Sequence, residues 1–267
     1  MSTVKSADGT TIAFEAIGEG RPLIMIDGAT GHRAVNPSNA EVAKLLSDEF
    51  RVYAYDRRGR GESTDTKPYA IQREIEDLAA LIEDAGQPAI VFGWSSGGLL
   101  ALDAAAAGLP ITALALFEPP VVVDDGRPPL PADYVERLEA SVEAGRPGDA
   151  VELFMTAGAN MPAEFVDAVR GTPIWSAVEE IAGTIAYDGR IMGTTMSGNP
   201  LPAERWAAVD VPVLVMHGDN TPPYLKTGPA AVAELLATAR LLPVPGENHN
   251  VEPPVLAPVL RQFAHEL

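Results

Sequence analysis

Apolar positions along the chain follow two rhythms, one typical of helices and one of strands. In residues 71–85, apolar side chains recur at the three- and four-residue spacing of one helix face, and Gly86 then supplies a stop. In Pro22–Ile26, by contrast, nearly every residue is apolar, which is typical of a strand that is buried on both faces. The Asp8-Gly9 pair between two short runs near the start predicts a hairpin-type turn.

Strand and helix patterns alternate through most of the sequence, and this alternation predicts the fold class. The predicted strands are Thr3–Ser6, Thr11–Ile17, Pro22–Ile26, Arg51–Tyr55, Ala89–Phe92, Ile111–Phe117, Val211–Met216 and Arg240–Val244. The predicted helices that accompany them are Glu41–Leu46, Ile71–Ala85, Ser96–Ala107, Ala230–Ala237 and Pro254–His265. Because strands that alternate with helices need crossover connections, we expect an α/β fold with a mostly parallel central sheet flanked by helices.

The middle of the chain lacks this alternation. Between Pro119 and Pro202 there are prolines and short helical patterns but no convincing buried strand. The predicted helices of this stretch are Pro131–Ala144, Asp149–Met155, Ala163–Val169 and Ser176–Thr184. We therefore predict an α/β core formed by residues 1–118 and 203–267, interrupted by a helical cap of residues 119–202.

Composition and charge narrow the classes of function. The formal net charge of −18 opposes binding to nucleic acids and to anionic membrane surfaces, and it favours solubility. The absence of cysteine excludes disulfides, thiol catalysis and thiolate metal sites. The most membrane-like window, Leu99–Phe117, is interrupted by Asp103, Gly108 and Pro110, and the start of the chain has no apolar stretch of the signal-peptide kind. We expect a cytoplasmic protein with neither a nucleic-acid nor a membrane partner.

The strongest chemical signal is a serine between two glycines. Residues 93–97 read Gly-Trp-Ser-Ser-Gly and lie between a predicted buried strand and a predicted helix. A serine on such a sharp turn needs glycines two positions before and after it, because bulkier residues would clash. Only Ser95 is in register with both glycines, since Trp94 stands where Ser96 would need one. A serine hydroxyl becomes a good nucleophile only when a base accepts its proton. The alternative is a glycine- and serine-rich turn without chemistry.

With this turn in place, the chain resembles the α/β-hydrolase superfamily over nearly all of its length outside the insertion. Asp27-Gly28-Ala29 follows the third strand, where most members have His-Gly. Residues 56–63, Asp-Arg-Arg-Gly-Arg-Gly-Glu-Ser, resemble the family's Asp-x-x-Gly-x-Gly-x-Ser loop after the fourth strand. Gly246-Glu247-Asn248-His249 follows the last strand, where the family keeps its catalytic histidine.

The resemblance implies nucleophilic acyl transfer and assigns the parts. Ser95 would be the nucleophile and His249 the general base. The backbone N–H groups of Ala29 and Ser96 would form the oxyanion hole. His217, at the end of a strand, fits the base role less well than His249.

Two carboxylates are candidates for the residue that orients His249. Most relatives place an aspartate two to four residues beyond a glycine after the strand 211–216, whereas Asp219 follows Gly218 directly. Some members, including lactonases of the zearalenone type, place the acid after the preceding strand, which here ends in Glu118. We prefer Glu118, because a glutamate directly after an apolar strand is an unusual position for a charge that faces solvent; Asp219 remains the alternative.

The resemblance therefore implies a serine hydrolase that cleaves a carboxylic ester or lactone through an acyl-enzyme intermediate, without a cofactor or metal. Its substrate is expected to be small and hydrophobic, with Trp94 and His32 as substrate-binding residues. One alternative keeps the site but changes the reaction, to that of a C–C bond hydrolase, lyase or cyclase of secondary metabolism. The other alternative is a non-catalytic ligand-binding protein on a hydrolase scaffold.

Overall fold

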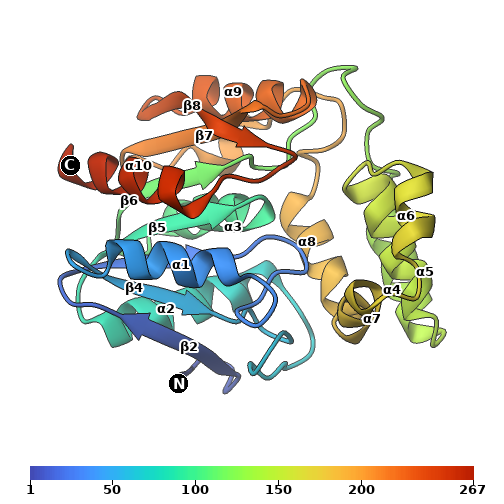
Figure 1. The fold of residues 1–267 in the computed structure, drawn as a ribbon, viewed down its shortest axis with the longest axis horizontal. Helices are drawn as coiled ribbons and strands as arrows, with labels where there is room; N and C mark the ends of the chain where they lie inside the picture. Colours follow the sequence, from blue (N-terminus) through green and yellow to red (C-terminus); the bar gives the residue numbers. More distant parts are fainter.

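The computed structural model describes residues 1–267 and contains one eight-stranded sheet in the order β1-β2-β4-β3-β5-β6-β7-β8 (Figure 1). β1 and β2 pair antiparallel with their neighbours, and the strands from β4 to β8 in this order all pair in parallel. The strands are β1 (Ser2–Lys5), β2 (Thr11–Ile17), β3 (Arg21–Ile26), β4 (Phe50–Tyr55), β5 (Ala89–Trp94), β6 (Ile111–Phe117), β7 (Val213–Asn220) and β8 (Ala239–Glu247). The α/β-hydrolase fold predicted from the sequence is confirmed.

Helices cover both faces of the sheet (Figure 1). One face packs against α1 (Pro37–Leu46) and α10 (Pro253–His265), and the other against α2 (Ile71–Ala85), α3 (Ser96–Ala106) and α9 (Tyr224–Leu235). Apolar side chains therefore form two cores, one on each side of the sheet. Every residue of β5 is buried, because both of its faces are covered.

The segment between β6 and β7 is helical throughout its regular part and contains no strand. Its helices gather at one end of the sheet, with α8 closest to the core (Figure 1). They are α4 (Tyr134–Glu143), α5 (Pro147–Leu153), a π-helical turn (Phe154–Gly158), α6 (Ala163–Val169), α7 (Pro173–Glu180) and α8 (Ile185–Met192). The division into a core and a cap remains a prediction.

Some element bounds differ from the sequence prediction. The predicted helix Ser176–Thr184 is wrong in its second half, since α7 ends at Glu180 and a 3₁₀ turn follows. The strand predicted to end at Met216 continues to Asn220, because β8 pairs with it beyond that point. No helix of the structure has both the length and the apolar character needed to cross a membrane.

Candidate active site

The turn between β5 and α3 has the geometry that its glycines predict. Ser95 has φ 49° and ψ −124°, a conformation that is strained for a residue with a side chain. A Cβ on Gly93 would lie 2.5 Å from the Cα of Gly98, and a Cβ on Gly97 would lie 2.6 Å from the carbonyl oxygen of Ile26. Only glycine fits at these two positions, so the close approach of three backbone segments holds Ser95 in its strained, half-buried position.

Glu118 and His249 come together at the C-terminal edge of the sheet. Glu118 follows β6 directly, is completely buried, and has a left-handed φ of 45°. Its Oε2 lies 2.5 Å from Nδ1 of His249, and its Oε1 accepts a hydrogen bond of 2.9 Å from the backbone N–H of Gly218. His249 lies in the loop after β8, and 38% of its side chain is exposed. Because Glu118 contacts Nδ1, Nε2 is the ring nitrogen of His249 that is left to exchange a proton with another group.

Asp219, the other candidate acid, does not contact the histidine. It lies near the end of β7, and its Oδ1 accepts a hydrogen bond of 3.3 Å from the backbone N–H of Gly246. Asp219 is exposed to solvent, whereas Glu118 is buried. Of the two carboxylates, the structure therefore brings Glu118 to His249.

Ser95 follows β5 and His249 follows β8, and packed aromatic rings connect these two parts of the site. The ring of Phe117 packs 4.9 Å from that of Trp94 and 6.3 Å from the imidazole of His249, measured between ring centroids. No hydrogen bond joins the Ser95 hydroxyl to His249 in this structure. Such bonds are often long in ligand-free enzymes and tighten when substrate binds.

The loop after β3 lies against the serine turn. A Cβ on Gly28 would be 2.9 Å from Cβ of Ser95, so this position must be a glycine for the loop to come so close. Ala29 follows Gly28 in this loop, and Ser96 follows Ser95 as the first residue of α3, so both expected oxyanion residues adjoin a residue of this close contact.

Asp27 anchors the start of this loop. The carboxylate is buried and accepts hydrogen bonds from the amides of Asn36, at 2.6 Å, and Asn39, at 2.7 Å. Burial raises the pKa of Asp27 to about 6, although the Asn36 amide and the nearby guanidinium groups of Arg60 and Arg57 act in the opposite direction. The carboxyl of Asp27 therefore holds a proton more tightly than an exposed aspartate does.

The two predicted substrate-binding residues differ in their surroundings. The Trp94 indole donates a hydrogen bond of 2.9 Å to Asn39 and is only 9% exposed, so most of its surface belongs to the core. His32 is partly buried, and its Nδ1 has no hydrogen-bond partner in the structure. Burial lowers the pKa of His32, which favours the neutral imidazole. Substrate contact by either residue stays a prediction.

Sequence reasoning missed Asp188, a residue of α8. Its carboxylate is fully buried and accepts hydrogen bonds from Arg57, at 2.6 Å, from the Ser96 hydroxyl, at 2.7 Å, and from Arg60. Burial by itself would raise the pKa of Asp188, but Arg57 and Arg60 hold that pKa below its usual value. The signal was present: three arginines in residues 57–60 need carboxylate partners if they are buried.

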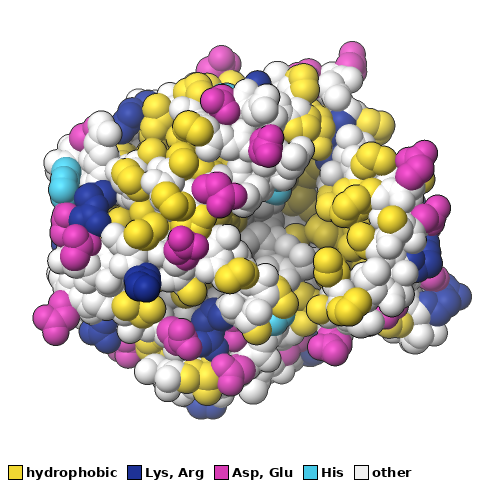
Figure 2. Space-filling model, viewed as in Figure 1, with side chains coloured by type: hydrophobic (Ala, Val, Ile, Leu, Met, Phe, Trp, Pro, Cys, Tyr) yellow, Lys and Arg dark blue, Asp and Glu magenta, His cyan; other side chains and the backbone are white.

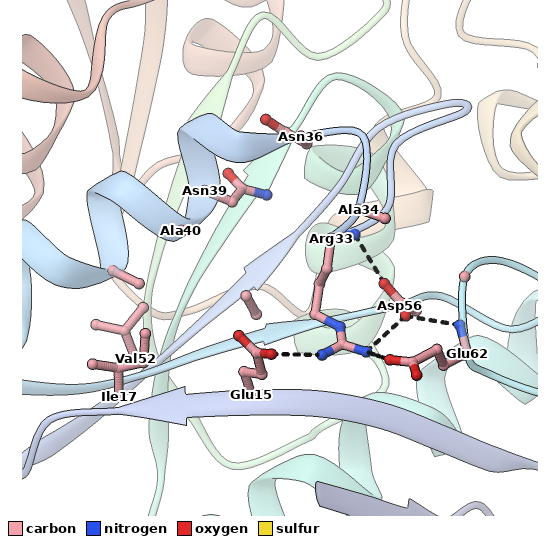
Figure 3. Close-up of a pocket in the computed structure, with 13 residues that line it drawn as sticks. Glu15, Ile17, Arg33, Ala34, Asn36, Asn39, Ala40, Val52, Asp56 and Glu62 are labelled. Carbon is pink, nitrogen blue, oxygen red and sulfur yellow. Dashed lines mark hydrogen bonds and ion pairs between the residues drawn. The ribbon is translucent and has the colours of Figure 1, made fainter. Parts of the chain in front are cut away.

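A separate pocket of about 250 Å³ lies next to the loop that follows β3, between β2, β4 and α1 (Figure 3). There Arg33 donates to Asp56 twice, from its backbone N–H and its guanidinium, each at 2.9 Å, and it also pairs with Glu62. Ser95, Glu118 and His249 do not line this pocket. The space-filling view instead shows a hollow between the α/β part and the helical segment, bordered by hydrophobic and histidine side chains (Figure 2).

Comparison with known proteins places the chain in a family. The model of the alpha/beta hydrolase family matches residues 28–261. An alpha/beta hydrolase structure from Sphaerobacter thermophilus DSM 20745 is 46% identical, with a TM-score of 0.89, and the match covers 98% of this chain and 100% of that one. A non-heme chloroperoxidase from Streptomyces lividans is 28% identical, with 98% of this chain and 99% of the relative covered.

The fold also matches a thermophilic esterase from Thermogutta terrifontis, with a TM-score of 0.71 and 21% identity over 99% of this chain and 98% of that one. At this identity the match supports the fold alone. The family match agrees with the serine turn between β5 and α3, the histidine and the buried carboxylate described above. The chain belongs to the alpha/beta hydrolase family, and these relationships support a hydrolase.

Proposed function

We propose that the protein is a serine hydrolase that cleaves a carboxylic ester or lactone through an acyl-enzyme intermediate. The observation that carries this proposal is the 2.5 Å contact between Glu118 and His249 at the sheet edge that also holds Ser95. A carboxylate on Nδ1 holds the imidazole in the tautomer that accepts a proton on Nε2, and it stabilises the imidazolium that forms.

The reaction would proceed in two halves. Ser95 Oγ attacks the carbonyl carbon while Nε2 of His249 accepts the hydroxyl proton, and the alcohol leaves with that proton as the acyl-enzyme forms. Water then attacks the acyl-enzyme with His249 again as base, which releases the acid and restores Ser95. In both halves the backbone N–H groups of Ala29 and Ser96 would stabilise the oxyanion.

The proposed substrate is small and hydrophobic. Hydrophobic side chains border the hollow between the α/β part and the helical segment, which supports an apolar acyl or ring group there (Figure 2). We assign the helical segment, residues 119–202, as a cap over this hollow, with Trp94 and His32 as substrate-binding residues. No cofactor or metal takes part in this mechanism.

A second candidate is peroxide in place of water as the acceptor of the acyl group. The name of the Streptomyces lividans relative, a non-heme chloroperoxidase, favours it. Attack of hydrogen peroxide on the acyl-enzyme would form a peracid and free Ser95, with the same residues in the same roles. Adding hydrogen peroxide to the ester assay and measuring peracid separates this outcome from plain hydrolysis.

The test of the proposed function is a panel of esters and lactones with product analysis, run on the wild type and on Ser95→Ala. We expect the wild type to release the acid and the alcohol, or the opened hydroxy acid, and Ser95→Ala to release neither above background. Products of C–C cleavage, elimination or cyclisation would favour the alternative reactions at the same site. Tight binding without turnover would favour a ligand-binding protein.

A further inference from the structure

The carbonyl group of Gly28 belongs to the same peptide unit as the N–H of Ala29, which is one of the two proposed oxyanion donors. Nη1 of Arg60 donates a hydrogen bond of 2.8 Å to this carbonyl oxygen and a longer one, 3.4 Å, to that of Gly31. A cation bonded to the oxygen of a peptide fixes the plane of the peptide. It also draws electron density from the nitrogen, which makes the N–H a stronger donor.

The other proposed donor is fixed through its own side chain. The hydroxyl of Ser96 donates a hydrogen bond of 2.7 Å to Oδ1 of Asp188. Oδ2 of the same carboxylate accepts a hydrogen bond from Arg60. The carboxylate of Asp188 therefore connects Ser96, which carries one donor, with Arg60, which holds the peptide that carries the other donor.

All three members of this connection are out of contact with water. Ser96, Arg60 and Asp188 are each about 1% exposed. A buried ion pair is costly unless its hydrogen bonds are well made, and breaking one member leaves an uncompensated buried charge. The pair therefore holds its geometry firmly rather than fluctuating as a surface pair does.

We propose that Arg60 and Asp188 are positioning residues that hold the two oxyanion donors, the N–H groups of Ala29 and Ser96, in one geometry. The inference rests on the proposed serine hydrolase function. It goes beyond that function because Asp188 belongs to α8, in the helical segment. The oxyanion hole is then complete only while α8 is docked on the core.

Arg60→Gln and Asp188→Asn test this directly, with an oxygen ester and its thionoester as the substrate pair. A thiocarbonyl sulfur is a weak hydrogen-bond acceptor and gains little from the oxyanion donors. We expect kcat for the oxygen ester to fall about 10- to 100-fold, somewhat less than the loss of one whole donor, with little change in KM. The oxygen-ester to thionoester rate ratio should shrink by a similar factor.

Two further variants keep the test usable if a buried charge proves necessary for folding. Arg60→Lys retains the charge, but a single ammonium group does not reproduce the fork that reaches both Gly28 and Asp188. Ser96→Ala leaves all buried charges in place and removes only the hydroxyl. Both should shrink the rate ratio, with thermal melting and titrated active sites used to normalise for folded protein.

Arg58→Gln is the matched control. Arg58 belongs to the same sequence motif and is equally buried, but it pairs with Asp77 and Asp8 and not with the oxyanion loop. Its variant should keep the wild-type rate ratio. If folded Arg60 and Asp188 variants also keep that ratio, or Arg58→Gln shifts it equally, the inference is wrong while the hydrolase proposal stands. If the wild type has no Ser95-dependent hydrolysis, the two proposals fail together.

Discussion

At the residue scale, Glu118 uses each carboxylate oxygen for a different task. Oε1 is held by the backbone N–H of Gly218, and Oε2 meets Nδ1 of His249. The backbone bond fixes the carboxylate from β7, so its second oxygen points at the imidazole without help from solvent. Both terminal atoms of the side chain at position 118 must therefore be hydrogen-bond acceptors.

The first prediction follows from that arrangement. Glu118→Gln places an amide where an acceptor is needed, which favours the wrong tautomer of His249, so kcat should fall about 10³- to 10⁴-fold with little change in stability. Steady-state kinetics on an activated ester measure the effect. Asp219→Asn is the control and should stay within about threefold of the wild type. A large loss confined to Asp219→Asn would identify Asp219 as the acid instead.

Asp27 gives the second prediction, on the pH dependence of stability. Burial raises its pKa from 3.8, the ordinary value for an aspartate, to about 6, so the native state binds the proton more tightly than the unfolded chain does. Stability from this group is therefore full below about pH 4 and is lost as the pH rises through 6. In Asp27→Asn this loss should be absent.

Urea unfolding at pH 4.5 and pH 7.5 measures this loss of stability with rising pH. Between these two pH values the free energy of unfolding of the wild type should fall relative to that of Asp27→Asn by on the order of 2 kcal/mol. Titration of the other groups is common to both proteins and cancels in the comparison. Parallel pH profiles for the two proteins would show that Asp27 does not titrate in this range.

At the scale of the elements, the turn between β5 and α3 depends on backbone contacts that leave no room for a Cβ. The third prediction is that Gly93→Ala destabilises the protein by about 3 kcal/mol and abolishes activity, because the added carbon meets backbone atoms of Gly97 and Gly98. Gly183→Ala is the matched control: its Cβ meets nothing closer than a Val142 methyl at 3.9 Å, so stability should change by less than about 0.5 kcal/mol. Thermal melting compares the two, and an equally stable, active Gly93→Ala would contradict the prediction.

Elements with local signals could be predicted from the sequence. β5, its turn and α3 are marked by an apolar run, two glycines and a helix pattern within one short stretch, and the structure has them at that place. α8 has no such signal. It is a short helix with Gly189 near its end, and it is buried by contacts with α3 and α4 that are distant in sequence. The three arginines of residues 57–60 indicated that buried carboxylate partners exist, but no local pattern identified Asp188 as one of them.

At the scale of the whole molecule, the meeting of Glu118 with His249 depends on topology. The two residues are 131 positions apart, and they meet because β6, β7 and β8 are neighbours in one parallel sheet. Sequence reasoning reduced the acid to two candidates on adjacent strands, but only the fold decides which of their side chains faces the imidazole. The sequence favoured Glu118 over Asp219 because of its place directly after an apolar strand, and the structure brings Glu118 to the imidazole.

The net charge of −18 gives the fourth prediction. Like charges repel across the surface of the compact state, and salt screens them over about 10 Å at 0.1 M. The melting temperature should therefore rise by a few degrees between 20 mM and 300 mM sodium chloride. Choline chloride should give the same rise if the effect is screening and not ion binding. A melting temperature that falls with either salt would show that attractive surface pairs dominate.

The most direct test of the central claim is the site of labelling by a fluorophosphonate probe, read by peptide mass spectrometry. Such a probe reacts only with a serine whose proton is taken by a neighbouring base. We predict one phosphonyl group per chain on the peptide that contains Ser95, much slower labelling in Glu118→Gln, and none in Ser95→Ala. Folded wild-type protein that is left unlabelled, or is labelled at another residue, would contradict the account.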